Sequence, residues 1–169
     1  ALSVHLKKWN VYKVSAAELF NQLQHSEGEN QVHLDWSKSH NWQLSLFPND
    51  LRSSDYKVRT TTGGVLPNGA NKTFEGYEQS LGGNVRLTVD VDFIYGYVES
   101  GGERYFIEPL WYYDRSAPRN LFVVYDEHDV IPRDDAKCAA HEMHERSEKL
   151  GKQNQNQEKL VGKQMPNIR

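Results

Sequence analysis

The sequence has little that would fix it by covalent links or hold it in a membrane. It contains one cysteine, Cys138, so an intrachain disulfide is excluded and cysteine pairing indicates no redox compartment. No apolar run approaches the roughly 18–20 residues that cross a bilayer, and we expect no membrane segment. Ala1 leads directly into strand-like sequence, so we expect that a targeting segment is absent or already removed.

The chain also lacks an excess of positive charge. Its formal net charge is −3 at pH 7, whereas proteins that coat nucleic acid present a strongly basic surface to the phosphates. We therefore expect no nucleic-acid partner. Hydrophobic residues make up only 37% of the chain, which is low for a globular protein, and they are unevenly distributed.

Aromatic residues are missing from residues 132–169, so only residues 1–131 can build a hydrophobic core. This contrast predicts a β-rich body over residues 1–131, a short segment over residues 132–150, and a polar tail over residues 151–169. Ala139–Leu150 has the pattern of a helix. The last segment has too little apolar area to fold by itself, and we expect it to be extended or mobile.

The stretch Val85–Leu110 carries the largest share of the expected core. The residues of its first half that alternate onto one face are Val85, Leu87, Val89, Val91, Phe93, Tyr95 and Tyr97. Period two over this length is typical of a half-buried antiparallel strand. Ser100–Gly102 supplies turn chemistry and Tyr105–Leu110 returns as a second apolar run, so we predict a β-hairpin with a bend near Asp92–Gly96.

Shorter β-rich segments surround this hairpin. We expect strands over Ser3–Val14, Gln31–Ser37, Asn41–Phe47, Tyr56–Thr62, Thr73–Ser80 and Asn120–Tyr125. Ser15 and Glu18 form a capping box that predicts a helix of about two turns, ending at Gly28 and Asn30. About seven to nine strands predict an all-β antiparallel sandwich or partly closed barrel, with one short N-terminal helix and an extended or partly helical C-terminal tail. The alternative is a single curved sheet with the helix on one face.

Three acidic or histidine-containing groups invite a catalytic or metal-binding interpretation. His141 and His144 stand at i and i+3, whereas the zinc-protease motif places its histidines at i and i+4, so a solvated helix face is favoured. Asp90 and Asp92 share a face of the predicted strand, as polar residues on a solvent-facing strand do. Asp126–Asp129 is similarly interpreted as a solvated turn. The sequence has no nucleophile elbow, phosphate loop or Ser/His/Asp pattern, and we expect that the chain is not an enzyme by itself.

Two further features concern the surface. Asn71 begins an Asn-Lys-Thr sequon in a Gly/Asn-rich loop, which makes it the candidate glycosylation site if the chain is secreted by a eukaryote. Trp36 and Trp42 could stack on sugars, but they fall in phase with the buried strand positions. Core packing is therefore the favoured interpretation of these two tryptophans.

Cys138 is the clearest candidate for chemistry. It lies outside the predicted β body, in a polar segment beside Lys137 and the small residues Ala139 and Ala140. A neighbouring cation favours the thiolate, which is the form that binds metal. A free thiol on an extended arm after a folded body is what a zinc-capping segment requires, because the thiolate can occupy the open zinc position of a partner's active site.

The order of several motifs carries a family resemblance. Tyr105–Leu110 reads Tyr-Phe-Ile-Glu-Pro-Leu, the strand-like Phe122–Tyr125 follows, and the isolated Cys138 comes after both. The upstream segments that agree in order are Leu44–Phe47, Tyr56–Thr60 and Thr73–Gly76. Over roughly residues 1–140, the chain resembles the prodomains of reprolysin/adamalysin-type zinc metalloproteases, the family that includes the ADAM proteases. It departs from their pattern at Ala139, where glycine usually follows the cysteine.

The resemblance implies a propeptide that keeps a following zinc protease latent and assists its folding. The Cys138 thiolate would bind the catalytic zinc of that domain at about 2.3 Å and displace the water that the enzyme must activate. Zinc would thus be the partner's cofactor, and the chain would have none of its own. A trypsin-like or convertase protease would cleave after Arg169 to release the prodomain. The family works outside cells or at their surface, so the expected location is secreted or extracellular.

The alternative function is a carbohydrate- or protein-binding β-sandwich whose C-terminal tail is a linker. It predicts a contiguous patch of exposed aromatic side chains and a dispensable Cys138. The sequence beyond Arg169 separates the two hypotheses, because the protease family requires a His-Glu-x-x-His-x-x-Gly-x-x-His motif there.

Overall fold

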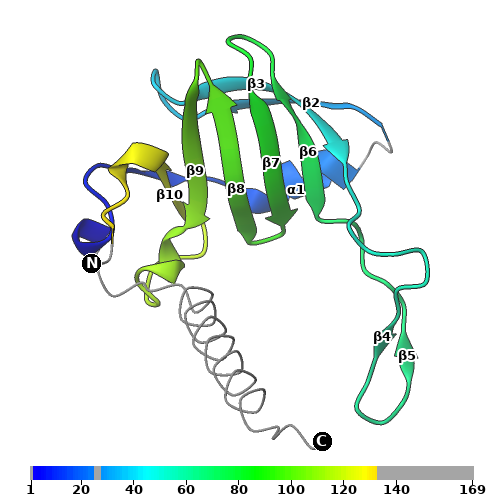
Figure 1. The fold of residues 1–169 in the computed structure, drawn as a ribbon. Coiled ribbons are helices and arrows are strands. Elements are labelled where there is room, and N and C mark those ends of the chain that lie inside the picture. The colour runs from blue at the N-terminus through cyan, green and yellow to red at the C-terminus, as the bar shows by residue number, and fades with distance from the viewer. Residues whose placement is uncertain (1, 25–27, 133–169) are drawn as a thin grey trace, which may run out of the picture. The chain divides into compact units, whose positions relative to one another are not determined.

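The computed structural model describes residues 2–24 and 28–132 (Figure 1). Residues Ala1–Ile131 belong to one compact unit. The predictions made for Cys138, for a helix over Ala139–Leu150 and for the polar tail that ends at Arg169 lie outside the described residues.

The body is built almost entirely of strands. The strands are β1 (Asn10–Lys13), β2 (Asn30–Asp35), β3 (Asn41–Pro48), β4 (Val58–Arg59), β5 (Val65–Leu66), β6 (Thr73–Glu78), β7 (Asn84–Asp90), β8 (Phe93–Ser100), β9 (Glu103–Pro109) and β10 (Leu121–Asp126). The helices are the α-helix α1 (Ala16–Gln24) and the 3₁₀ turns η1 (Leu2–Val4), η2 (Leu110–Tyr112) and η3 (Glu127–Asp129).

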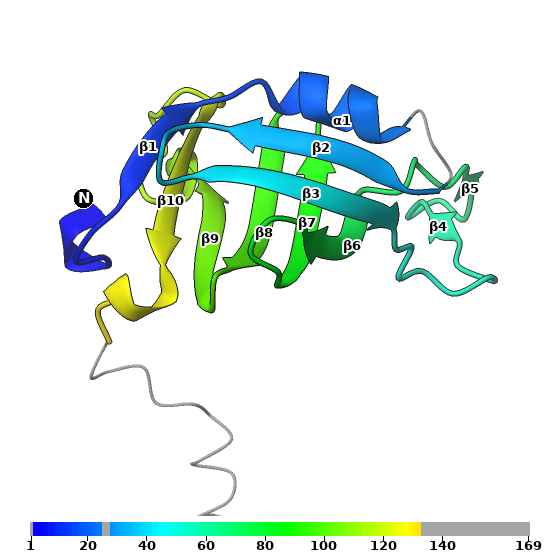
Figure 2. The ribbon, with the colours of Figure 1, turned by 90° about the horizontal axis from the view of Figure 1, so that it is seen from above.

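Eight strands form one antiparallel sheet in the order β1-β10-β9-β8-β7-β6-β3-β2, and β4 pairs with β5 in a separate two-stranded ribbon. The eight-stranded sheet curls into a half-barrel, in which β2 and β3 run across the consecutive strands β6 to β9 (Figure 2). The prediction of an all-β antiparallel fold with one short helix is confirmed. Of the predicted architectures, the structure has the partly closed barrel.

The main core lies on the inner face of the curled sheet, where α1 packs against β7 and β8. The Ser15 hydroxyl accepts a hydrogen bond from the Glu18 N–H at 3.3 Å, which is the N-cap that the sequence predicts. Leu19 and Leu23 are buried and join strand residues such as Leu44 and Leu87 in one cluster. Because the helix is short and amphipathic, this packing, rather than helix propensity, stabilises it.

Side chains connect the two edges of the sheet. Tyr12 on β1 bonds through its hydroxyl to Ser37 Oγ at 2.9 Å and to His40 Nδ1 at 2.6 Å, both in the turn after β2. β1 and β2 are the first and last strands of the sheet, so these bonds close the half-barrel. Trp42 is buried and Trp36 packs partly buried against the same cluster, which confirms the core interpretation of both tryptophans.

The long strand predicted from Val85 is in fact two strands, β7 and β8. The chain reverses at Val91 and Asp92, so Asp90 pairs with Phe93. The two residues that flank a two-residue turn lie on the same face of the hairpin. The buried positions therefore change from odd-numbered residues before the turn to even-numbered residues after it. As a result Ile94 and Val98 are fully buried. The residues predicted as buried that instead lie on the outer face are Phe93, Tyr95 and Tyr97.

Other predicted elements exist with narrower bounds. The strand predicted over Ser3–Val14 is shorter and is preceded by the turn η1, and the segment Tyr56–Thr62 contributes only the two residues of β4. These are boundary differences of the kind expected where caps and pairing partners decide the ends. Helix α1 spans Ala16–Gln24, in agreement with the predicted helix of about two turns.

Candidate functional site

The end of the described body is held at a fixed point. The Ile131 N–H donates to the His5 carbonyl at 2.8 Å, and Leu6 forms an isolated antiparallel bridge with Val130. Each contact joins two backbone segments that are more than a hundred residues apart in the sequence. The N-terminal segment therefore fixes where the chain leaves the body toward Cys138, and we call this point the chain exit.

A second hydrophobic cluster, on the outer face of β9 and β10, anchors the N-terminal segment. Its buried members are Leu6, Val123 and Tyr125. The partly buried side chains packed against them are Leu2, Trp9, Phe106 and Tyr113. Because apolar burial stabilises both sides of a contact, this cluster stabilises the chain exit as well as the strands.

The Ile-Glu-Pro-Leu motif lies at the end of β9 and links the inner core to the chain exit. Ile107 is fully buried in the inner core, and Glu108 accepts a hydrogen bond from the Tyr113 hydroxyl. Desolvation by burial, together with that bond to a carboxylate, raises the pKa of Tyr113, which therefore stays a neutral donor. The Tyr113 ring contacts the His5 ring, with 5.5 Å between the centroids.

The metal ligand and cleavage residues predicted from the sequence lie beyond this point. Cys138 and Arg169 are outside the described residues, as are His141 and His144, for which a solvated helix face is the favoured interpretation. Cys138 is the sixth residue after Pro132, the last described residue. An extended chain spans at most about 3.3–3.6 Å per residue. The Cys138 backbone therefore lies within about 22 Å of Pro132, whatever the conformation of the chain between them.

Four aromatic residues form a cluster at the outer surface, and we call them the aromatic patch: Phe93, Tyr95, Trp111 and Tyr112. Their ring centroids lie 4.6 Å apart for Trp111 and Tyr112 and 6.0 Å apart for Tyr95 and Tyr112. Phe93 contacts the other three at 6.1–6.4 Å. Tyr95 is 42% and Tyr112 48% exposed, so the patch presents ring surface to solvent.

Sequence reasoning missed the aromatic patch because it assumed an unbroken strand through Val91. The available signal in the sequence was Asp90-Val91-Asp92, because aspartate disfavours strands. In the structure, Val91 between them is 57% exposed. A turn at that point moves the following aromatics to the outer face. Trp111 and Tyr112 then reach the same face from η2, through a contact that no local pattern encodes.

The rim of the patch carries a cation. The Arg119 guanidinium lies 4.1 Å from the centroid of the Trp111 ring, a cation–π arrangement. The Trp111 Nε1 atom is buried and has no hydrogen-bond partner within residues 2–24 and 28–132. A hollow of about 220 Å³ adjoins Tyr95 and is lined also by Leu51, Arg86 and Thr88 among others, so the surface beside the patch is uneven and partly polar.

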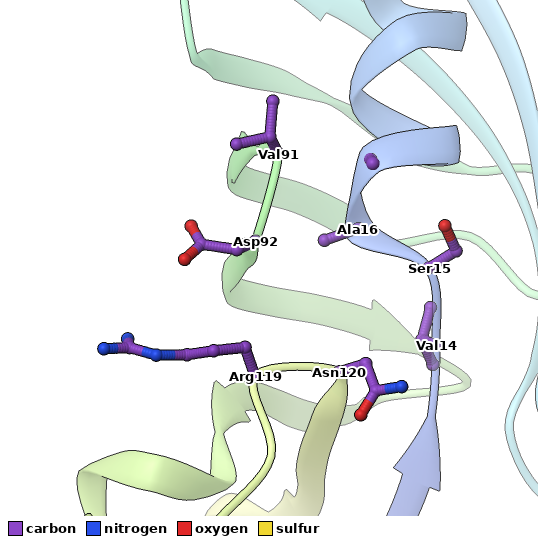
Figure 3. A pocket seen from close by; sticks show the side chains of 8 residues that line it. Val14, Ser15, Ala16, Val91, Asp92, Arg119 and Asn120 are labelled. Carbon is purple, nitrogen blue, oxygen red and sulfur yellow. The ribbon is translucent and has the colours of Figure 1, made fainter.

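A second hollow, of about 240 Å³, lies beside the N-terminus of α1 (Figure 3). Val14, Ala16 and Val91 contribute its apolar lining, while Asp92 and Arg119 point away from α1 (Figure 3). Its lining contains no nucleophile–base pair. The idea that Asp90 and Asp92 form a carboxylate pair on one strand face is wrong, because Asp92 lies in the turn and Asp90 pairs with Lys72.

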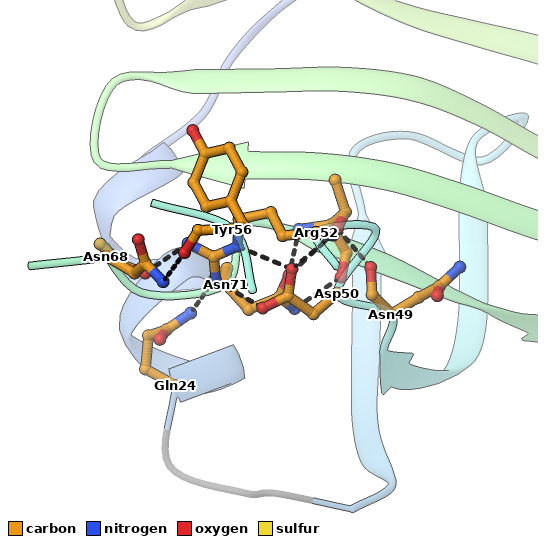
Figure 4. Close-up of polar contacts among 9 residues, drawn as sticks. Gln24, Asn49, Asp50, Arg52, Tyr56, Asn68 and Asn71 are labelled. Carbon is orange, nitrogen blue, oxygen red and sulfur yellow. Dashed lines mark hydrogen bonds and ion pairs between the residues drawn. The ribbon is translucent and has the colours of Figure 1, made fainter. Parts of the chain in front are cut away.

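The predicted glycosylation residue lies in a polar loop network before β6 (Figure 4). The Asn71 side-chain amide donates to the Thr73 carbonyl at 2.7 Å, and the Thr73 hydroxyl donates to Asn71 Oδ1 at 3.0 Å. Gln24 on α1 donates to the Asn71 carbonyl at 2.9 Å. Asn71 is half-buried, and its glycosylation stays a prediction.

One histidine–carboxylate group stands beside the chain exit. Ligand atoms of Glu103, Asp126 and His128 all lie within 4.8 Å of one another. Asp126 accepts bonds from the His128 N–H at 2.8 Å and from Nδ1 at 2.7 Å, and the bond to Asp126 raises the pKa of His128. These bonds cap η3 and account for the geometry of the group, as expected for a solvated turn.

Comparisons with known proteins assign no family. No protein-family model matches the chain, and no curated protein matches it. Across the described residues, no helix has both the length and the apolar character needed to cross a membrane. Interpretation of the site therefore rests on the motif order in the sequence and on the geometry around the chain exit and the aromatic patch.

Proposed function

We propose that the chain is the propeptide of a zinc metalloprotease and keeps that enzyme latent through Cys138. The observation that carries the proposal is the position of this single cysteine, which follows Ile131 by seven residues, together with the backbone bonds that hold the chain at Val130 and Ile131. The order of motifs over roughly residues 1–140, with Ile-Glu-Pro-Leu at 107–110, supports the same function.

The proposed mechanism is a ligand exchange at the partner's zinc. The Cys138 thiol loses its proton, and Lys137 beside it favours the resulting anion. The Cys138 thiolate would be the residue that holds the partner's zinc, at the coordination position that the protease otherwise leaves to the water it activates. Cleavage after Arg169 separates the two domains covalently. Dissociation of the prodomain would then leave that position free for the water on which the protease depends.

The test adds the chain to the catalytic domain that follows it in the precursor and measures the inhibition constant. We expect Cys138→Ala to weaken inhibition at least about tenfold, because a metal–thiolate bond is lost. Ser147→Ala is the matched control, since it truncates a similarly small side chain in the same segment. Protection of Cys138 from alkylation by the zinc-loaded domain, but not by the zinc-free domain, reports the sulfur–zinc contact directly.

Two outcomes contradict parts of the proposal. If Cys138→Ala inhibits as well as the unmodified chain, latency comes from steric blocking by the β body. If the unmodified chain neither inhibits nor binds the protease domain, the propeptide function is wrong.

A second candidate function is a carbohydrate- or protein-binding domain, and the aromatic patch is the observation that favours it. Exposed rings can stack on sugars or fill pockets in a partner. This function predicts binding that requires Tyr95 and Tyr112 and is indifferent to Cys138. A glycan array probed with the full chain and with Cys138→Ala separates it from the propeptide function.

A further inference from the structure

Three side chains that can bind a metal ion meet beside the chain exit, and each comes from a different element. Glu103 begins β9, Asp126 ends β10 and His128 lies in η3. His128 Nδ1 lies 2.7 Å from Asp126 Oδ1 and 3.5 Å from Glu103 Oε2, and ligand atoms of all three lie within 4.8 Å of one another. Around a zinc ion with bonds of about 2.0–2.2 Å, neighbouring ligand atoms lie roughly 3–3.5 Å apart. Small side-chain rotations would therefore bring all three onto one ion.

The pairing of β9 with β10 positions two of these ligands. Asp126 pairs with Tyr105, and Glu103 precedes Tyr105 by two residues on the same strand. Opposed residues and residues two apart share a face of the sheet, so the carboxylates of Glu103 and Asp126 are diagonal neighbours. Asp126 also caps η3 by accepting a hydrogen bond from the His128 N–H at 2.8 Å, which holds the imidazole beside both carboxylates. The sheet register and the cap thus order the three ligands.

The two carboxylates have no lysine or arginine partner. Among the ion pairs in the described part of the chain, Glu103 and Asp126 pair only with His128. The nearby cations are engaged elsewhere, because Lys7 Nζ donates to the His128 carbonyl at 3.1 Å and Arg104 pairs with other carboxylates. Two neighbouring carboxylates repel each other when both are ionised. A cation bound between them would remove that repulsion.

The ligand atoms indicate which kind of cation fits. An imidazole nitrogen and two carboxylate oxygens suit a divalent transition-metal ion such as Zn²⁺, whereas Ca²⁺ and Mg²⁺ prefer oxygen ligands. Three protein ligands leave the remaining coordination positions to water. The side chains of His128 and Glu103 are 73% and 51% exposed, so an ion and its water molecules can reach the group.

We propose that Glu103, Asp126 and His128 bind a divalent transition-metal ion that ties η3 to the start of β9. His128 Nδ1 releases the proton that it shares with Asp126 and donates its lone pair to the ion, while Nε2 carries the proton of the neutral imidazole. Each carboxylate contributes one oxygen. Because η3 leads directly into Val130 and Ile131, whose backbone contacts fix the chain exit, the ion would also stabilise that exit. The inference goes beyond the proposed function, since it requires neither Cys138 nor a protease.

The test follows zinc binding at this site by NMR on the full chain. Free Zn²⁺ is set with a chelator buffer, so that binding by other residues does not distort its concentration, and the His128 ring signals are identified by their loss in His128→Gln. We expect these signals to shift as zinc rises in the unmodified chain. In Glu103→Gln and in Asp126→Asn, which each remove one ligand, the same shift should require at least about tenfold more zinc.

Glu75→Gln is the matched control, because the Glu75 side chain is 45% exposed against 51% for Glu103 and lies on β6. It should titrate with zinc as the unmodified chain does. Mg²⁺ at the same concentrations should leave the His128 signals in place. The tie between η3 and β9 has its own measurement, since zinc should slow amide hydrogen exchange at Val130 and Ile131 in the unmodified chain and in Glu75→Gln, but not in Glu103→Gln.

Several outcomes would overturn the inference. If the His128 signals do not move up to millimolar zinc, or if Mg²⁺ moves them equally, there is no transition-metal site. If Glu103→Gln and Asp126→Asn titrate as the unmodified chain does, His128 binds zinc alone, as an ordinary surface histidine does. Zinc binding that depends on all three ligands but leaves exchange at Val130 and Ile131 unchanged shows that the ion does not tie η3 to β9. None of these results affects the propeptide function, which is measured by inhibition of the protease.

Discussion

At the scale of single residues, His40 is a buried titratable side chain that packs against aromatic rings. It is only 5% exposed, its ring lies 5.3 Å from Trp42 and 5.4 Å from Tyr105, and Nδ1 bonds to the Tyr12 hydroxyl. Burial lowers the pKa of His40 below its ordinary value of 6.5. No carboxylate bond to His40 is found in the described part of the chain, so nothing compensates a charge there.

We predict that the body becomes less stable as the pH falls from about 7.5 to about 5.5. The unfolded chain takes up a proton at His40 near pH 6.5, whereas the folded chain resists it until lower pH. The stability linked to neutral His40 is therefore present above pH 6.5 and is lost as the pH falls toward the folded-state pKa. Urea unfolding at a series of pH values measures this slope.

The His40→Phe variant supplies the comparison. It loses the bond to Tyr12 and is expected to be less stable near pH 7.5, but the part of the pH slope caused by His40 should vanish. His128 acts in the opposite direction because its bond to Asp126 raises its pKa, yet its side chain is 73% exposed and solvent weakens such pairs. Equal slopes in the variant and the unmodified chain would contradict the assignment to His40.

At the scale of elements, β7 and β8 approach each other closely at Gly96. Gly96 has φ of 147°, and a Cβ atom there would lie 2.0 Å from the Arg86 carbonyl oxygen. Such a separation requires the backbone of a paired strand to move. The strand that carries the aromatic patch is therefore positioned by a residue without a side chain.

We predict that Gly96→Ala destabilises the body by about 2–4 kcal/mol, measured as the free energy of unfolding in urea. Gly69→Ala is the control, because a Cβ atom at Gly69 meets nothing within 4 Å and should change stability by at most about 0.5 kcal/mol. Similar losses in the two variants would show that the strand contact at Gly96 does not limit stability.

The comparison of sequence and structure is also clearest for elements. Alternation correctly predicts β2 and β3, where Val32, Leu34, Leu44 and Leu46 are buried, because period two reports a single buried face. It fails at Val91 because the alternation of apolar residues continues across the two-residue turn, so that two strands read in the sequence as one long strand. The pairing of β1 with β10 joins the two ends of the body, and no local pattern encodes such a distant contact.

The candidate functional residues also fall into those that the sequence predicts and those that only the structure brings together. A lone cysteine after a core-forming body can be recognised from composition, so Cys138 is a sequence-level candidate. The aromatic patch and the chain exit are not, since they arise where η2 meets β8 and where the N-terminal segment meets η3. Interaction surfaces built from several elements become visible only when the topology is known.

At the scale of the whole molecule, the proposed propeptide would combine a folded β body with a thiolate, and the short segment between Pro132 and Cys138 would be the arm that joins them. The affinity of such a molecule depends on the length of the arm, because the arm sets the effective concentration of the thiolate at the zinc once the body is docked. For a flexible connection beyond its optimal length, that concentration falls roughly as the −3/2 power of the number of residues. Arm length is therefore a variable that tests whether the β body and the thiolate act on the same protease domain.

We predict that a flexible Gly/Ser spacer of about 12 residues inserted after Pro132 weakens inhibition about fivefold, because it triples the arm. The same spacer inserted after Gly151 is the control, since it lies beyond Cys138 and leaves the arm unchanged. Inhibition constants of both chains against the zinc-loaded protease domain provide the measurement. An equal effect of both insertions would mean that the thiolate and the body do not act on the same protease molecule, whereas a loss confined to the first insertion supports a tethered thiolate guided by a docked body.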